Sequence, residues 1–196
     1  MKMSEVEDWS MDKCIDWLKN PYNQPDRELD DSFDRAFRGS VEKRLGKLTE
    51  NLKKVFIAIR FMHMYQKDNN VKTDCLTNTL ILYDICRALS LDVKAVNKVV
   101  AFKKSKNLCV GHILVNVEGK DLECSYDMSE DYRGEEPIYL DELPKEIKDK
   151  DKCYEKFKEF AKDINNGKFL IANKTNYDNQ MELLAKVLKF QLTKKK

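Results

Sequence analysis

The clearest pattern of apolar positions lies in the middle of the chain, over residues 75–89. The spacing predicts a helix with apolar side chains on nearly all of its sides: Leu76, Leu80, Ile81, Leu82, Tyr83, Ile85, Ala88 and Leu89. A helix that is apolar all round is buried in a core. Thr73 and Asp74 precede it, and their oxygens can accept hydrogen bonds from the amides of its first turn. We therefore expect a buried helix with Cys75 at, or one residue from, its N-terminus.

Strand-like runs follow this helix. They are rich in β-forming side chains and have the length of strands, at residues 93–102, 108–117 and 122–126. Residues 118–120 separate the last two runs and predict a tight hairpin around Gly119. Residues 138–140 and 168–172 are candidates for short edge strands. The pattern predicts a small antiparallel β-meander after the buried helix.

Helical patterns stand on both sides of the predicted meander. Residues 1–28 hold both tryptophans in a short helical pattern that two prolines end, because proline lacks the amide hydrogen. Over residues 31–62 apolar side chains recur at steps of three and four, with two glycines that predict two helices or one bent helix. A last amphipathic helix contains Met181, Leu184, Val187 and Leu188. Helices, then strands, then helices predict an α+β fold.

The length of 196 residues suits one domain with appendages. We expect residues 1–66 to form an N-terminal helical region that packs on the core. Residues 67–143 are expected to form the core itself. Residues 144–196 are expected to complete the same domain with a strand and helices.

Composition narrows the classes of function. The chain is 42% hydrophobic and 36% charged, with a net charge of +2. So small a net charge disfavours a dedicated nucleic-acid binder, whose affinity depends on many basic side chains. No apolar run approaches the ~20 residues of a membrane span, and the first ten residues lack a signal-like apolar stretch. We expect a soluble, cytoplasmic protein.

The six cysteines do not have the spacing of a zinc knuckle or of a redox pair. We therefore expect reduced thiols, no metal and no cofactor. The chain has two histidines, His63 and His112, so chemistry that needs an imidazole has two candidates. His63 lies near the end of a predicted helix, where the helix dipole favours its cation.

Three residues form a candidate constellation in chain order: Cys75, His112 and Asp127. The positive end of a helix dipole favours thiolate at Cys75, and thiolate is the nucleophilic form of cysteine. His112 and Asp127 flank the predicted turn at Gly119 almost symmetrically, so antiparallel pairing would bring them side by side. An aspartate that accepts from one imidazole nitrogen leaves the other nitrogen for the sulfur.

This order of residues resembles the transglutaminase-like superfamily. The likeness covers roughly residues 69–130: a cysteine that opens a buried helix, a strand 111–115 that begins Gly-His, and a strand that ends 125–127 with Ser-Tyr-Asp. The resemblance implies a papain-like α+β core with Cys75 as nucleophile, His112 as general base and acid, and Asp127 as orienting residue. It also implies a protein or peptide substrate, attacked at an amide bond by hydrolysis or acyl transfer.

The alternative is a catalytically inactive module of the same fold that binds a protein partner in the same groove. Thr73 and Leu76 stand where the superfamily commonly has a glycine and an aromatic residue, and these departures keep the alternative open. Gln66, Asn69 and Asn70 are candidates for a second oxyanion donor beside the amide of Cys75. The acidic residues from 130 to 142 suggest either a cleft rim that favours a basic substrate or a solvated loop.

Overall fold

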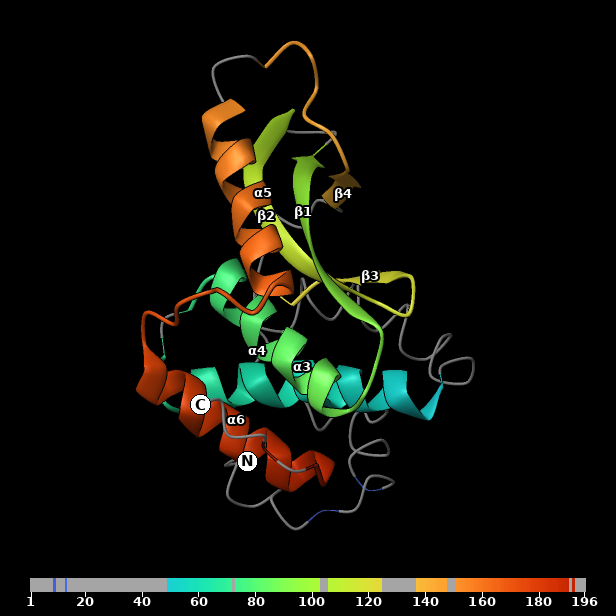
Figure 1. Cartoon of the computed structure of the whole chain (residues 1–196), viewed down its shortest axis with the longest axis vertical. Helices are drawn as coiled ribbons and strands as arrows, with labels where there is room; N and C mark the ends of the chain where they lie inside the picture. The colour runs from blue at the N-terminus through green and yellow to red at the C-terminus, as the bar shows by residue number, and fades with distance from the viewer. Residues whose placement is uncertain are drawn as a thin grey trace.

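The computed structural model describes Trp9, Lys13 and residues 49–71, 73–102, 106–124, 137–147, 151–190 and 192. Within these residues lie four helices of more than one turn and one four-stranded sheet (Figure 1). Their order is α3 (Glu50–Asp68), α4 (Cys75–Ala88), β1 (Val93–Phe102), β2 (Asn107–Val117), β3 (Lys120–Leu122), β4 (Pro137–Leu140), α5 (Asp151–Asn165) and α6 (Lys174–Leu188). The predicted α+β fold is confirmed.

The sheet is antiparallel throughout, with the strand order β3-β2-β1-β4. β1 and β2 are long and pair from Val93↔Val117 to Phe102↔Asn107. β3 returns along β2 through the turn at Glu118 and Gly119, as the sequence predicted. β4 pairs with the far side of β1, from Val99↔Leu140 to Phe102↔Pro137.

Helix α4 begins at Cys75, as the sequence predicted, because Asp74 caps it. The Asp74 Oδ1 accepts a hydrogen bond from the amide of Thr77 at 2.7 Å. Beyond the first turn the helix is largely buried, and it packs against α3, α6, β1 and β2. This burial explains why its sequence is apolar on nearly all sides.

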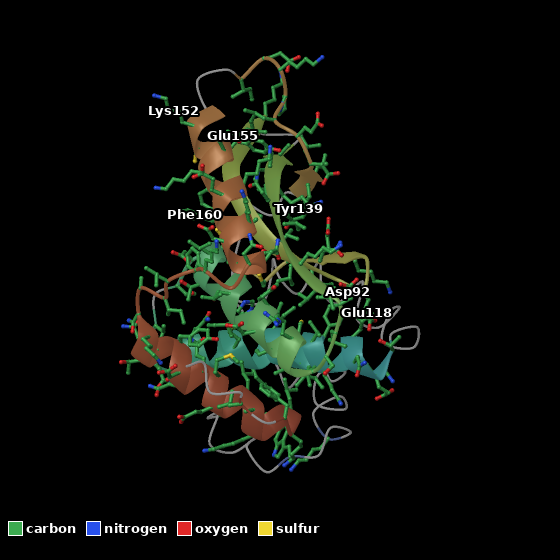
Figure 2. All side chains as sticks on the ribbon, viewed as in Figure 1. Asp92, Glu118, Tyr139, Lys152, Glu155 and Phe160 are labelled. Carbon is green, nitrogen blue, oxygen red and sulfur yellow. The ribbon has the colours of Figure 1, made fainter. Side chains whose placement is uncertain are left out.

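The remaining helices cover different parts of the molecule. α5 lies along β1 and β2, whereas α3 and α6 pack with α4 on the other end of the sheet (Figure 1). The side-chain amide of Asn165, the last residue of α5, pairs with the backbone N–H and C=O of Ala95 in β1 at 2.8 and 2.9 Å. Lys152 and Glu155 are exposed near the start of α5, at the far end of the molecule from α6 (Figure 2).

Two predicted strands differ from the structure. Residues 168–172 form a loop and not an edge strand, since Gly167 with its positive φ of 67° ends the preceding turn and Asn173 already caps α6. Phe169 in this loop packs edge-on against Phe160 of α5, and Leu170 is 88% exposed. β3 ends at Leu122, while the predicted strand continued to residue 126.

Several expectations fall outside the described residues. They concern the helical arm of residues 1–28 except Trp9 and Lys13, most of the helical pattern before residue 49, and Asp127. No helix in the described part of the chain is long and apolar enough to cross a membrane.

Candidate active site

Cys75 is the first residue of α4, and its side chain is partly exposed. The amides of a first helical turn have no acceptor within the helix, and their dipoles favour negative charge. The positive end of the α4 dipole therefore lies at Cys75.

His112 lies on β2 directly after a β-bulge. Lys98 pairs with His112 and Val99 pairs with Val110, so Gly111 is an extra residue on β2 without a partner in the register. Gly111 has a φ of +88°, and a Cβ there would lie 2.6 Å from the Phe157 ring of α5. Only glycine fits such a conformation and such a close approach. The bulge therefore explains why a glycine stands before the histidine.

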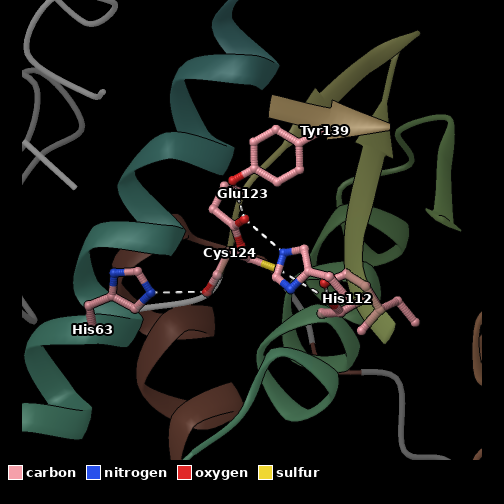
Figure 3. A network of polar contacts seen from close by, with 7 residues as sticks. His63, His112, Glu123, Cys124 and Tyr139 are labelled. Carbon is pink, nitrogen blue, oxygen red and sulfur yellow. Dashed lines mark hydrogen bonds and ion pairs between the residues drawn. The ribbon is translucent and has the colours of Figure 1, made fainter. Parts of the chain in front are cut away.

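The His112 ring is buried, with 2% of the residue exposed, and the side chains that act on it or lie beside it include those of Glu123, Cys75 and Tyr139. Its Nε2 lies 2.8 Å from Glu123 Oε2 (Figure 3). Cys75 acts on the ring through a side-chain hydrogen bond and through its charge. Because Nε2 is engaged by Glu123, the ring nitrogen that remains for the sulfur is Nδ1.

The surroundings of His112 favour its protonated form. Burial alone lowers the pKa of His112, but the charge of Glu123, the hydrogen bonds with Cys75 and Glu123 and the charge of Cys75 outweigh it and raise the pKa to about 10. At neutral pH His112 is therefore protonated, and its positive charge lies beside the Glu123 carboxylate.

Glu123 follows β3 and accepts a second hydrogen bond. The Tyr139 hydroxyl of β4 donates to the same Oε2 at 2.5 Å, and the Tyr139 and His112 rings have centroids 6.0 Å apart. Burial, and then the charge of Glu123, raise the pKa of Tyr139. Tyr139 therefore remains a hydrogen-bond donor over the whole neutral range.

The next residue, Cys124, is fully buried. Its Sγ lies 3.2 Å from the Thr79 hydroxyl of α4, and its carbonyl oxygen lies 3.0 Å from Nε2 of His63 on α3. Burial, and then the charge of Glu123, raise the pKa of the Cys124 thiol. Cys124 is therefore a core thiol, and His63 serves to hold its backbone.

Lys98 lies beside His112, since the two residues pair across β1 and β2. Its ammonium lies 2.5 Å from carboxylate oxygens of both Asp121 and Asp141. Burial lowers the pKa of Lys98, but the hydrogen bonds and charges of these two aspartates raise it overall. Lys98 therefore offsets two of the acidic side chains near the site.

The structure describes two of the three site residues that the sequence predicts. It brings Cys75 and His112 together, while Asp127 lies outside the described residues. Glu123, which the sequence pattern did not indicate, contacts His112. Glu123 comes one residue after the pair Val115↔Leu122 of β2 and β3, on the same face as His112, but the sequence pattern alone does not distinguish it from Asp127.

The candidate oxyanion donors differ in burial and in hydrogen-bond partners. Gln66 is buried, and its Nε2 donates to Asn78 Oδ1 and to Gln180 Oε1, both at 2.8 Å, so both amide hydrogens are used. Asn69 is exposed and donates to the Tyr65 carbonyl, and Asn70 is exposed as well. The structure therefore supports none of the three as the second donor.

Among the described residues, no group of His, Cys, Asp and Glu side chains is arranged to hold a metal ion. Comparisons of the chain with protein-family models, with curated proteins and with solved structures gave no match.

Proposed function

We propose that the protein is a cysteine-dependent hydrolase or acyl transferase that acts on an amide bond of a protein or peptide. The observation that carries this proposal is the position of His112, whose Nε2 lies 2.8 Å from the Glu123 carboxylate and whose pKa is raised by Glu123 and by Cys75. A nucleophile, a base within reach and a third group that orients the base are the parts of thiol catalysis.

The chemistry needs these parts in two steps. The Cys75 sulfur attacks the amide carbonyl, the carbon–nitrogen bond breaks, and His112 gives its proton to the leaving amine, which leaves a thioester on Cys75. Water or a second amine then attacks the thioester and gives its proton to His112. The carbon–sulfur bond breaks, and the thiolate and the imidazolium are restored together with a carboxylic acid or a new amide.

We further propose that the core is of the papain or transglutaminase-like kind. In support, a buried helix that begins with a cysteine is followed by an antiparallel meander that carries a histidine. Fold likeness does not select a substrate, so the substrate must be found by experiment.

The test is a peptide library made from a cellular protein digest, incubated with the full chain and read by mass spectrometry for new termini. A fluorescent primary amine in a parallel incubation reports acyl transfer. We expect cleaved or amine-labelled peptides with the natural chain and with Cys153→Ala, a matched control because Cys153 is an exposed thiol on α5. Cys75→Ala is expected to abolish both products.

Products that persist in Cys75→Ala would contradict the proposal. No products at all, together with a Cys75 that reacts no faster than Cys153, would favour the alternative of an inactive module that binds a protein partner. The departures at Thr73 and Leu76 are the sequence features that such a module would explain.

A further inference from the structure

Two donors meet on one oxygen of Glu123: Nε2 of His112 at 2.8 Å and the Tyr139 hydroxyl at 2.5 Å (Figure 3). Bonds of this kind to a charged carboxylate are roughly twice as strong as bonds between neutral groups. We propose that Glu123, fixed by Tyr139, is the positioning residue that orients His112 toward Cys75, in the role that the sequence suggested for Asp127. This inference rests on the proposed function, because orientation matters only if Cys75 and His112 react.

The role of Glu123 follows from the two nitrogens of imidazole. A carboxylate that accepts from Nε2 keeps a proton on that nitrogen, so the neutral ring has its lone pair on Nδ1. Nδ1 is the nitrogen left for Cys75. Glu123 therefore selects the tautomer that can take a proton from the sulfur and later return it to the leaving amine.

Residues 123 and 124 are held by contacts from three elements, one to the backbone and two to side chains. His63 of α3 bonds to the Cys124 carbonyl, Thr79 of α4 contacts the Cys124 thiol, and Tyr139 of β4 bonds to the Glu123 carboxylate. Figure 3 shows these contacts converging on residues 123 and 124. A positioning residue must itself be held in place, and these contacts supply that support.

Two other carboxylates of the described residues near His112 bind a lysine and not the histidine. Asp121 of β3 and Asp141, just after β4, both bind the Lys98 ammonium of β1. The groups that act electrostatically on His112 are Glu123 and Cys75 of α4. Among the described residues, Glu123 is therefore the carboxylate whose removal should change the titration of His112 most.

Histidine titration by NMR tests this role without any substrate. The full chain contains two histidines, so long-range proton–nitrogen spectra of the imidazoles show two spin systems, which a His63→Gln variant assigns. The titration midpoint of His112 and the protonation of its Nε2 are compared in the natural chain, Glu123→Gln and Asp127→Asn. The two variants are matched, because each replaces one carboxylate by its amide.

We expect Glu123→Gln to lower the His112 midpoint by about one to three pH units and Asp127→Asn to leave it within about half a unit. A fall in Asp127→Asn as large as in Glu123→Gln, or no fall in either, would overturn the inference. Should Glu123→Gln not fold, Glu123→Asp decides, since the shorter side chain cannot reach both partners and an unchanged midpoint would again overturn the inference.

Reactivity of Cys75 separates this inference from the proposed function. If iodoacetamide labels Cys75 no faster than Cys153 while Glu123→Gln alone shifts His112, the proposed function fails and the Glu123–His112 interaction stands without a catalytic role. If Cys75 is fast and Asp127→Asn alone shifts His112, the proposed function stands and the inference fails.

Discussion

Burial lowers the pKa of His112, whereas Glu123 and Cys75 raise it by a larger amount. The protonation of His112 therefore contributes to the free energy of unfolding. The pKa of His112 is raised in the folded chain to about 10, from an ordinary value near 6.5. The folded chain therefore keeps a proton that the unfolded chain releases between these values. The resulting stabilisation is fully present below about pH 6.5 and is lost as the pH rises through about 10.

We predict that His112→Gln reduces the free energy of unfolding by roughly 2–4 kcal/mol at about pH 6, and by clearly less at about pH 9.5. Urea unfolding followed by circular dichroism measures this at each pH. The comparison with the natural chain at each pH cancels the contributions of groups that do not interact with His112. A difference that is the same at both pH values would contradict the raised pKa of His112.

Some site residues were predictable from the sequence and one was not. Cys75 and His112 stood out because one precedes an all-apolar helix and the other lies in a strand beside a glycine. Glu123 was missed because equal distance from a turn locates a partner only to within about two residues. The register centres the turn between Glu118 and Gly119, so Glu123 and Asp127 are equally far from the position that mirrors His112.

At the scale of elements, the bulge at Gly111 in β2 lets α5 pack closely against the strand directly before His112. A Cβ on Gly111 would lie 2.6–2.8 Å from the Phe157 ring and 2.9 Å from the Cys153 sulfur. Gly119 has a similar φ of +80° but open space around it. Alanine at Gly119 therefore tests the energetic cost of a positive φ alone, whereas alanine at Gly111 adds the cost of a clash with Phe157 and Cys153.

We predict that Gly119→Ala lowers the free energy of unfolding by about 1–2 kcal/mol, and that Gly111→Ala lowers it by at least about 1 kcal/mol more. Gly111→Ala is also expected to slow the alkylation of Cys75, since the bulge places His112. Urea unfolding and thiol labelling measure the two effects. Equal losses of stability in both variants would show that Phe157 yields easily and that the bulge is not tightly packed.

Local sequence patterns predicted which segments form helices and strands, but they did not predict all of the ends of these elements or all of the loops. The apolar pattern of residues 75–89 predicted α4, and residues 118–120 predicted the turn between β2 and β3. Residues 168–172 contain a short apolar run that is typical of a strand, but in the structure Phe169 packs against Phe160 of α5 and Leu170 is exposed. Which surface an apolar residue covers depends on tertiary contacts that a local pattern does not contain.

At the scale of the whole molecule, α3, α4 and α6 share one core with the sheet. Polar contacts cross this core as well: Gln66 of α3 bonds to Asn78 of α4 and Gln180 of α6, and the Tyr177 hydroxyl of α6 donates to Asp84 of α4. Elements connected in this way are expected to unfold together. This layering is not predictable from local patterns, because it depends on which faces of the helices and of the sheet meet in three dimensions.

We predict that Cys86, at the centre of this core, reports the global transition. Cys86 is fully buried, and burial followed by the charge of Glu118 raises its pKa to about 12. In the folded chain its labelling at about pH 8 should be at least roughly a thousandfold slower than that of the exposed Cys153. As urea is added, Cys86 labelling should rise together with the loss of helix signal. Labelling that rises earlier would show that α4 opens independently of the rest.

The proposed function requires that His112 activates Cys75. Site-resolved alkylation by iodoacetamide at about pH 6, read by peptide mass spectrometry, tests it most directly, because an ordinary thiol with a pKa of about 8.5 is almost wholly protonated there. We predict that Cys75 reacts at least about tenfold faster than Cys153 in the natural chain and that His112→Ala removes this advantage. Equal alkylation rates for Cys75 and Cys153 in the natural chain, or fast alkylation of Cys75 that persists in His112→Ala, would show that His112 does not activate Cys75.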